Sequence, residues 1–284
     1  AGGVFEMDLM QTIITSVVQG LSEFLPISSS GHLIITSSLY KIFTGAELTS
    51  GGNQEVFYDI MLHIGTLVAV VIYFWEDLVN IFKSFFKAVK EKSFDNNPEA
   101  MMVPYVALGT VVTIAFALPF KDFFESLVSN PRGVGIFLLL TAFVLWFTEL
   151  YSKKHPRDNK LTWKKALLIG LFQGFAVTPG LSRSGSTIAA GLLCGMDRVK
   201  SARYSFLLSI PVILLAALYH CIEVTGFEEL KTFNWGLILL GSVLAAVVGY
   251  ACIKYFLIFL GKYSLNFFAA YCVVVGLFAI LYFK

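Results

Sequence analysis

The stretch QGLSEFLPISSSGH occupies residues 19–32, and a related stretch, PGLSRSGST, occupies residues 179–187. Each interrupts an apolar region, the first spanning residues 9–39 and the second residues 166–195. The arms on either side of each interruption have about 12–16 residues, so as helices they reach about 18–24 Å. The hydrocarbon core of a bilayer is about 30 Å thick. The sequence therefore predicts two re-entrant helical hairpins whose tips stop inside the membrane.

The composition of the whole chain agrees with a membrane protein. Of 284 residues, 57% are hydrophobic and 14% are charged, and the mean hydropathy is +0.75. Soluble domains average about 45–50% apolar and about 25% charged residues. This excludes an ordinary soluble enzyme and a disordered chain. The short alternating segments of a β-barrel are absent, and no basic patch with interleaved aromatic residues predicts a nucleic-acid partner.

Six further apolar stretches are long enough to cross a bilayer. They cover residues 57–75, 101–120, 133–148, 204–222, 235–257 and 264–283. The predicted fold class is an all-α polytopic membrane protein with six transmembrane helices and two re-entrant hairpins. Residues 78–92 alternate apolar residues with lysines at helical spacing, which predicts an amphipathic helix at the membrane surface. Four cysteines lie inside apolar segments without CxxC spacing, which predicts small buried residues: Cys194, Cys221, Cys252 and Cys272.

The two interrupted regions resemble each other at a fixed offset. Gln19-Gly20 and Gln173-Gly174 lie 154 positions apart. At the same offset, Ser28, Ser30 and Gly31 match Ser182, Ser184 and Gly185. Chance similarity between apolar segments is the alternative, but the ungapped match favours a single domain, residues 1–284, built from internal repeats at about 8–151 and 165–284. Because three spans separate the hairpins, the second hairpin enters from the opposite side, as in an inverted-topology repeat.

The basic residues predict the orientation. One side carries fifteen lysines and arginines, in residues 83–92, 153–165, 198–203 and 254–262, and the other side carries five. By the positive-inside rule, the richer side faces the cytoplasm. Both termini are then predicted on the outer side.

The hairpin tips carry the residue types of an anion site. In both tips, serines and a glycine immediately precede the second arm, and Arg183 lies on the second tip. A helix N-terminus leaves backbone N–H groups unpaired and carries partial positive charge. Two such ends and a planar guanidinium suit a diphosphate. Simple helix capping by the serines is the alternative.

Ionisable residues near the tips add two candidates. Glu23 beside a phosphate would be repelled unless it were protonated or bridged by a divalent cation, Mg²⁺ or Ca²⁺; a stabilising ion pair is the alternative. His32 fits a general acid, a base or a nucleophile, or equally a structural hydrogen bond. Asp59 and His63 lie four residues apart on one span and could line the cavity or pair with each other. Glu149 and His220 lie near span ends, where an interfacial position is the default.

With these residues in view, the chain resembles the bacterial undecaprenyl-diphosphate phosphatases of the bacitracin-resistance (BacA/UppP) type. Residues 19–32 resemble the first signature of that family and residues 179–187 the second. The resemblance implies a membrane hydrolase that cleaves a C55 polyprenyl diphosphate to the monophosphate and phosphate. It also implies recycling of the lipid carrier for cell-wall synthesis, bacitracin resistance, interdigitated inverted repeats and dependence on a divalent cation. The location that it implies is the cytoplasmic (inner) membrane of a bacterium, with the site open to the outer, periplasmic side.

The resemblance also implies roles for single residues. Glu23 is the acidic residue needed for catalysis, through the metal, and Ser29 is the nucleophile or phosphate contact. His32 is the acid or base, and Arg183 completes the catalytic set. The positions expected to bind the diphosphate are Gln19, Ser28, Ser30, Gly31, Ser182, Ser184, Gly185 and Thr187. Some members have glutamate at the first polar position of the motif. Here it is Gln19, which leaves Glu23 to hold the cation with substrate oxygens and water.

Two other functions fit part of the pattern. Inverted repeats with broken helices at the bilayer midplane are common in transporters, so the chain could instead move an anion or a polyprenyl phosphate. A passive channel fits less well, because the charged residues cluster at one depth. The expected partners are the polyprenyl diphosphate and membrane lipid, with a homodimer possible.

Overall fold

The computed structural model describes residues 8–45, 53–94, 97–126, 130–155, 157–224 and 233–283. Within these ranges the secondary structure is helical, without strands. The helices are α1 (Leu9–Ser22), α2 (Ser29–Thr44), α3 (Asn53–Tyr73), α4 (Trp75–Glu91), α5 (Met102–Ser126), α6 (Pro131–Lys154), α7 (Trp163–Phe175), α8 (Arg183–Leu193), α9 (Arg198–Val224), α11 (Trp235–Lys262) and α12 (Asn266–Tyr282).

Five of these helices are long and apolar enough to cross a membrane: α3, α5, α6, α9 and α11. The sixth predicted span corresponds to α12, which is apolar but has 17 residues. The prediction of an all-helical, polytopic membrane protein is therefore confirmed. Several helices extend beyond the predicted segments. For example, α6 begins at Pro131, where the Asn130 side chain caps it, and continues to Lys154.

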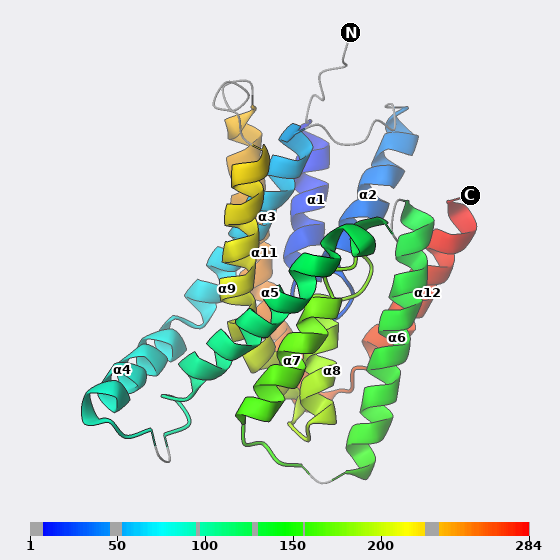
Figure 1. The fold of residues 1–284 in the computed structure, drawn as a ribbon. Coiled ribbons are helices and arrows are strands. Elements are labelled where there is room, and N and C mark those ends of the chain that lie inside the picture. Colours follow the sequence, from blue (N-terminus) through cyan, green and yellow to red (C-terminus); the bar gives the residue numbers. More distant parts are fainter. Residues whose placement is uncertain are drawn as a thin grey trace.

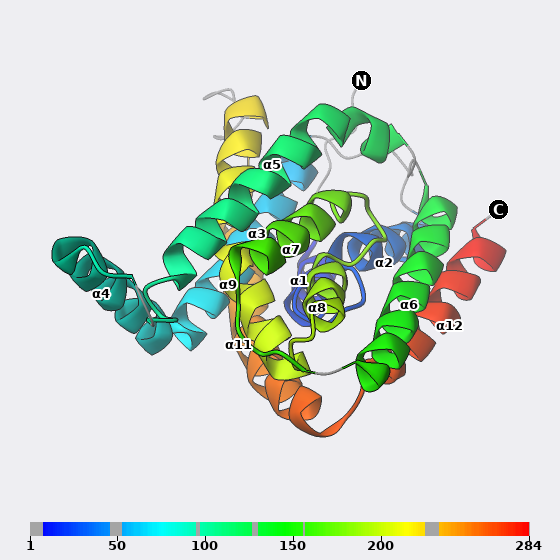
Figure 2. The same cartoon turned by 60° about the horizontal axis from the view of Figure 1, so that its bottom comes forward.

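The four shorter helices α1, α2, α7 and α8 lie in the centre of the molecule, and the long helices surround them (Figure 2). Helix α1 packs against α11, α7 against α5, and α12 against α6. Helices α3 and α9 also contact each other. The start of α1 and the end of α12 lie at the same end of the molecule (Figure 1). The predicted amphipathic helix is α4, which stands apart from the bundle and exposes Phe82 and Phe86.

Small residues allow some helices to approach very closely. A Cβ atom built on Gly65 of α3 would lie 2.2 Å from the backbone oxygen of Ser242 in α11. A Cβ on Gly170 of α7 would lie 2.5 Å from the backbone oxygen of Gly109 in α5. Close backbone contact of this kind strengthens van der Waals packing, which drives helix association in lipid.

The expectation of an interfacial position for Glu149 is wrong. Its side chain is completely buried. It accepts hydrogen bonds from Arg198 Nε at 2.6 Å and Nη2 at 2.7 Å, and from the backbone N–H of Leu265 at 2.8 Å. Position near a span end predicted solvent contact, but a bidentate arginine and a backbone donor compensate the buried charge. The cluster joins α6, α9 and the segment before α12.

Two cysteines are buried as expected and also support the first hairpin. Cys252 in α11 donates its S–H to the backbone oxygen of Leu21 at 3.2 Å. Cys272 in α12 donates to the backbone oxygen of Pro26 at 3.7 Å. Both acceptors lie where α1 ends and the chain turns, so each thiol adds a hydrogen bond from a long helix to the backbone of the first hairpin. Cys194 is partly exposed, and the Cys221 side chain lies outside the described residues.

Candidate functional site

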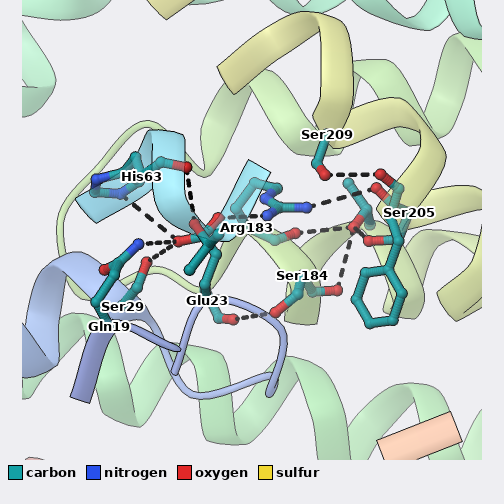
Figure 3. A network of polar contacts seen from close by, with 12 residues as sticks. Gln19, Glu23, Ser29, His63, Arg183, Ser184, Ser205 and Ser209 are labelled. Carbon is teal, nitrogen blue, oxygen red and sulfur yellow. Dashed lines mark hydrogen bonds and ion pairs between the residues drawn. The ribbon is translucent and has the colours of Figure 1, made fainter. Parts of the chain in front are cut away.

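The two predicted tips meet in the structure. The first tip is the turn between α1 and α2, and the second is the turn between α7 and α8. The hydroxyl of Ser184 donates a hydrogen bond to the backbone oxygen of Leu25 at 2.8 Å and so joins the tips directly (Figure 3). A Cβ atom built on Gly185 would lie 3.4 Å from Cβ of Pro26. Segments far apart in the sequence therefore form one site.

Both second arms begin with the same serine cap. The Oγ of Ser28 accepts the N–H of Gly31 at 3.3 Å, and the Oγ of Ser182 accepts the N–H of Gly185 at 3.0 Å. Simple capping thus accounts for these two serines. The hydroxyl of Ser29, one position after the first cap, is directed to the site instead.

The second tip is held by α6. Gly180 has a φ of +90°, a conformation that side chains rarely adopt. A Cβ there would lie 2.7 Å from the backbone oxygen of Val134. Thr141 donates its hydroxyl to the backbone oxygen of Gly180 at 3.1 Å and accepts the N–H of Ser182 at 3.1 Å. These contacts fix the turn that presents Arg183.

Glu23 is the centre of the site, and its side chain is only 5% exposed. One carboxylate oxygen, Oε1, lies 2.5 Å from Arg183 Nη2. The other, Oε2, accepts the hydroxyl of Ser29 at 2.7 Å and the Nε2 amide of Gln19 at 3.0 Å. Nε2 of His63 lies 3.6 Å from the same oxygen (Figure 3). The predicted ion-pair alternative for Glu23 is therefore present, with a hydroxyl, an amide and an imidazole beside it.

A cavity of about 420 Å³ opens onto this cluster. Glu23, Ser29 and Arg183 line one part of it. Helices α3 and α9 contribute much of the remaining lining, with Val56, Ile60, His63, Val212, Ile213 and His220. Thr113 of α5, Gln173 of α7 and three residues between α7 and α8 complete it. The site thus combines a charged, hydrogen-bonding region with an apolar wall, which suits an amphiphilic molecule with an anionic head.

Two predicted residues lie elsewhere. His32 does not contact Glu23 or Arg183; its ring bonds Tyr271 and the backbone of Ser28. Thr187 is completely buried and shares a 2.6 Å hydrogen bond with the hydroxyl of Ser205. The other predicted positions lie in the tips or beside them, although only Ser28, Ser29 and Ser30 of the serines line the cavity.

His63 was predicted only as a cavity-lining residue or a partner of Asp59. Both line the cavity. Nδ1 of the His63 ring donates to the Asp59 backbone oxygen at 2.8 Å, and Nε2 faces Glu23. The sequence signal that pointed to His63 was a histidine inside an otherwise apolar span. Thr141 and Ser205 carried no such signal, since threonine and serine are frequent in membrane helices.

The residues present offer few ligands for a metal ion. In the described part of the chain, no three His, Cys, Asp or Glu side chains group together. Oxygen donors at the site include the carboxylates of Glu23 and Asp59, which both line the cavity, and Oε1 of Gln19, which is buried and has no hydrogen-bond partner. Carboxylate and amide oxygens are ligands that Mg²⁺ and Ca²⁺ accept. These protein oxygens fit Mg²⁺ or Ca²⁺ as part of a coordination shell whose other ligands come from water or a bound molecule.

Known proteins resemble the chain along nearly its whole length. The family described as bacitracin resistance protein BacA matches residues 12–278. An undecaprenyl-diphosphatase of Halothermothrix orenii is 40% identical over 277 residues, which cover 97% of this chain and 98% of the relative. Undecaprenyl-diphosphatases of Methanosphaera stadtmanae and Thioalkalivibrio sulfidiphilus are each 37% identical, with coverages of 97% and 98% of this chain and 98% and 100% of the relatives.

Proposed function

The chain belongs to the bacitracin resistance protein BacA family, and from this we propose that it hydrolyses undecaprenyl diphosphate to undecaprenyl phosphate and inorganic phosphate within the membrane. The observation that carries the proposal is the meeting of Arg183, Ser29 and Glu23 at one apolar-walled cavity. Such an enzyme recycles the lipid carrier of cell-wall synthesis, and excess enzyme confers bacitracin resistance.

The geometry suits an amphiphilic diphosphate. The polyprenyl tail follows the apolar wall of α3 and α9 or remains in lipid, and the diphosphate lies at the tips. Arg183 is placed to bind phosphate oxygens with its planar fork. In the absence of substrate its positive charge is compensated by Glu23 at 2.5 Å. Binding of the diphosphate then exchanges one anionic partner of the guanidinium for another.

Catalysis in this site consists of positioning and charge stabilisation. In one route the Ser29 hydroxyl attacks the terminal phosphorus and its proton passes to the Glu23 carboxylate, to which it is hydrogen-bonded. The bond from that phosphorus to the bridging oxygen breaks, undecaprenyl phosphate leaves, and water then hydrolyses the phosphoserine to phosphate. In the other route Ser29 positions a water that attacks the same phosphorus and displaces undecaprenyl phosphate directly. Arg183 stabilises the charge that develops on the phosphate oxygens, and the helix ends add partial positive charge. The two routes differ in whether phosphoserine forms. Rapid-quench trapping of labelled phosphoserine supports the first, and its absence supports the second.

A divalent cation is part of the proposal. Glu23 and the Oε1 of Gln19 would hold it, together with oxygens of the substrate and water. When bound, the cation neutralises charge on the diphosphate and reduces its repulsion by the carboxylate. Gln19 is neutral, so of the two residues Glu23 alone supplies a carboxylate.

The helix arrangement supports an inverted repeat of residues 8–151 and 165–284. The first hairpin arm of each half packs on the next-to-last helix of the other half, α1 on α11 and α7 on α5. We propose that α1/α2 and α7/α8 are re-entrant hairpins and that α12 is the sixth span, since 17 residues reach about 26 Å. The excess of basic residues on one side supports outward-facing termini and an outward-facing cavity.

The direct test measures phosphate release from C55 polyprenyl diphosphate by the purified protein in detergent. We expect release that falls with a chelator and returns with added Mg²⁺ or Ca²⁺. Glu23→Gln provides the matched inactive control, because it keeps the shape of the side chain and removes its charge. A second arm uses vesicles to follow movement of a labelled polyprenyl phosphate. Movement across the vesicle membrane without phosphate release would contradict the hydrolase and support a transporter.

A further inference from the structure

The first tip has an unusual backbone at Ser28. Its φ is +71° and its ψ is 101°, and Lys92 is the other non-glycine residue with positive φ in the described ranges. Residues with side chains rarely adopt this conformation, which is strained and persists only where neighbouring contacts enforce it. Ser28 directly precedes Ser29, so the direction in which the Ser29 hydroxyl points depends on this strained residue.

His32 holds the strained residue in place. Its backbone N–H and its ring Nδ1–H both donate to the backbone oxygen of Ser28, at 3.1 and 2.8 Å. A carbonyl can only accept, so Nδ1 carries a proton and the neutral ring has its lone pair on Nε2. That lone pair accepts the hydroxyl of Tyr271 at 2.9 Å. Both nitrogens are therefore occupied away from Glu23 and Arg183.

Tyr271 fixes the histidine from the other half of the chain. Its ring stacks on the imidazole with centroids 5.6 Å apart and an interplanar angle of 13°. Its neighbour Cys272 donates to the backbone oxygen of Pro26 in the same tip. Helix α12 thus contacts the tip through two consecutive residues. A Cβ on Gly31 would lie 2.9 Å from a side-chain atom of Val134, so the first turn of α2 also has little room to move toward α6.

We propose that Tyr271 is a positioning residue of the phosphatase site, and that it acts through His32 to hold Ser28 and so to aim the Ser29 hydroxyl. The inference rests on the proposed function and changes the expectation for His32, which then serves as a hydrogen-bonding support and not as an acid or base. The chain Tyr271–His32–Ser28 links α12 to the nucleophile-bearing turn without touching the substrate.

Amide replacements of His32 separate the two roles. Asparagine places its amide nitrogen where Nδ1 was and keeps the bond to Ser28, whereas glutamine places it near Nε2 and loses that bond. Neither side chain titrates. If His32 supports Ser28, His32→Asn keeps kcat within about 10-fold of wild type and His32→Gln lowers it about 100-fold, the scale for a misplacement of about 1 Å. If His32 is an acid or base, both lose activity equally.

Tyr271→Phe keeps the stacked ring and removes the hydroxyl. We expect kcat to fall about 3- to 10-fold with KM unchanged, the scale of one hydrogen bond. In the His32→Asn background, Tyr271→Phe should lower kcat no further, because asparagine has no atom in the place of Nε2 for the Tyr271 hydroxyl to bond. Such non-additivity is the mark of two coupled residues. Tyr282→Phe, on the same helix but outside this chain of contacts, should leave kcat unchanged.

A second readout does not depend on hydrolysis. In a Ser29→Cys variant, mass spectrometry measures the rate at which a small thiol reagent labels residue 29. Tyr271→Phe and His32→Gln should change this rate, and His32→Asn should not. Equal labelling rates in all variants, or equal loss of activity in His32→Asn and His32→Gln, would overturn the positioning role. Absence of phosphate release from wild type with altered labelling would instead contradict the proposed function alone.

Discussion

Glu23 and Arg183 are 160 positions apart in the chain, and their side chains form an ion pair with 2.5 Å between Oε1 and Nη2. Each residue lies at the tip of a different helical hairpin. Both are largely buried, so their charges are compensated by each other more than by water. The pair marks the point at which the two halves of the chain meet.

The first prediction concerns the guanidinium. Arg183→Lys keeps the positive charge but loses the fork that binds two oxygens at once. We expect phosphate release to fall about 10²- to 10³-fold, the scale for removing one preorganised donor from a site of developing charge. Steady-state release from polyprenyl diphosphate measures it, with size-exclusion chromatography to show that the variant is folded. Activity within a few-fold of wild type would refute a phosphate-binding role for Arg183.

The second prediction concerns the hydroxyl that Glu23 orients. Ser29→Ala removes the 2.7 Å hydrogen bond to Oε2 and with it the hydroxyl proposed to attack phosphorus or to position the attacking water. We expect phosphate release to fall at least about 100-fold, whichever route of attack operates. Ser37→Ala, two turns further along α2, serves as the matched control and should retain activity. Equal activity of the two variants would remove Ser29 from the mechanism.

The third prediction separates stability from activity. Glu149→Ala leaves the Arg198 guanidinium without its buried partner, which should lower the free energy of unfolding by about 3–5 kcal/mol. Asp77→Asn removes the ion pair between Asp77 and Arg203, whose side chains are 41% and 43% exposed, respectively. Because water already screens this pair, the substitution should lower the free energy of unfolding by at most about 1 kcal/mol. Thermal unfolding in detergent compares the two. Similar unfolding temperatures would show that the Glu149 cluster contributes little.

The fourth prediction concerns the contact between α3 and α11. Gly65→Ala places a Cβ 2.2 Å from the Ser242 backbone oxygen, so the helices must separate. We expect a loss of about 1–3 kcal/mol in the free energy of unfolding. Gly261 has open space around its Cβ direction, and Gly261→Ala should change stability by less than about 1 kcal/mol. An unchanged unfolding temperature for Gly65→Ala would contradict this close approach.

Much of the site could be predicted because its signals are local or follow from the repeat. Ser28 and Ser182 precede a glycine-containing first turn, and both serve as caps. The predicted inverted repeat brings the two tips together, and Glu23 does meet Arg183 there. The length of an apolar segment likewise predicts a helix, but it does not predict the residues at which the helix begins and ends.

The remaining contacts depend on which helices pack together. The Tyr271 hydroxyl and Thr141 resemble many other polar groups in apolar spans, and nothing local connects them with the tips. Glu149 was misjudged because its partner, Arg198, becomes its neighbour only when α6 and α9 pack. Hydrogen bonds across helices are set by tertiary packing, which spacing in one sequence does not reveal.

The most direct test of the central claim asks whether the two tips touch. Pro26→Cys with Gly185→Cys places Cβ atoms about 3.4 Å apart, close to the separation found in disulfides. In a background without the native cysteines, and with a protease site inserted in the linker between α6 and α7, oxidation should keep the cleaved halves together on a denaturing gel. Gly45→Cys with Gly185→Cys, which joins the far end of α2 to the second tip, is the control and should not cross-link. Separation of the halves in the first variant after oxidation would contradict the account.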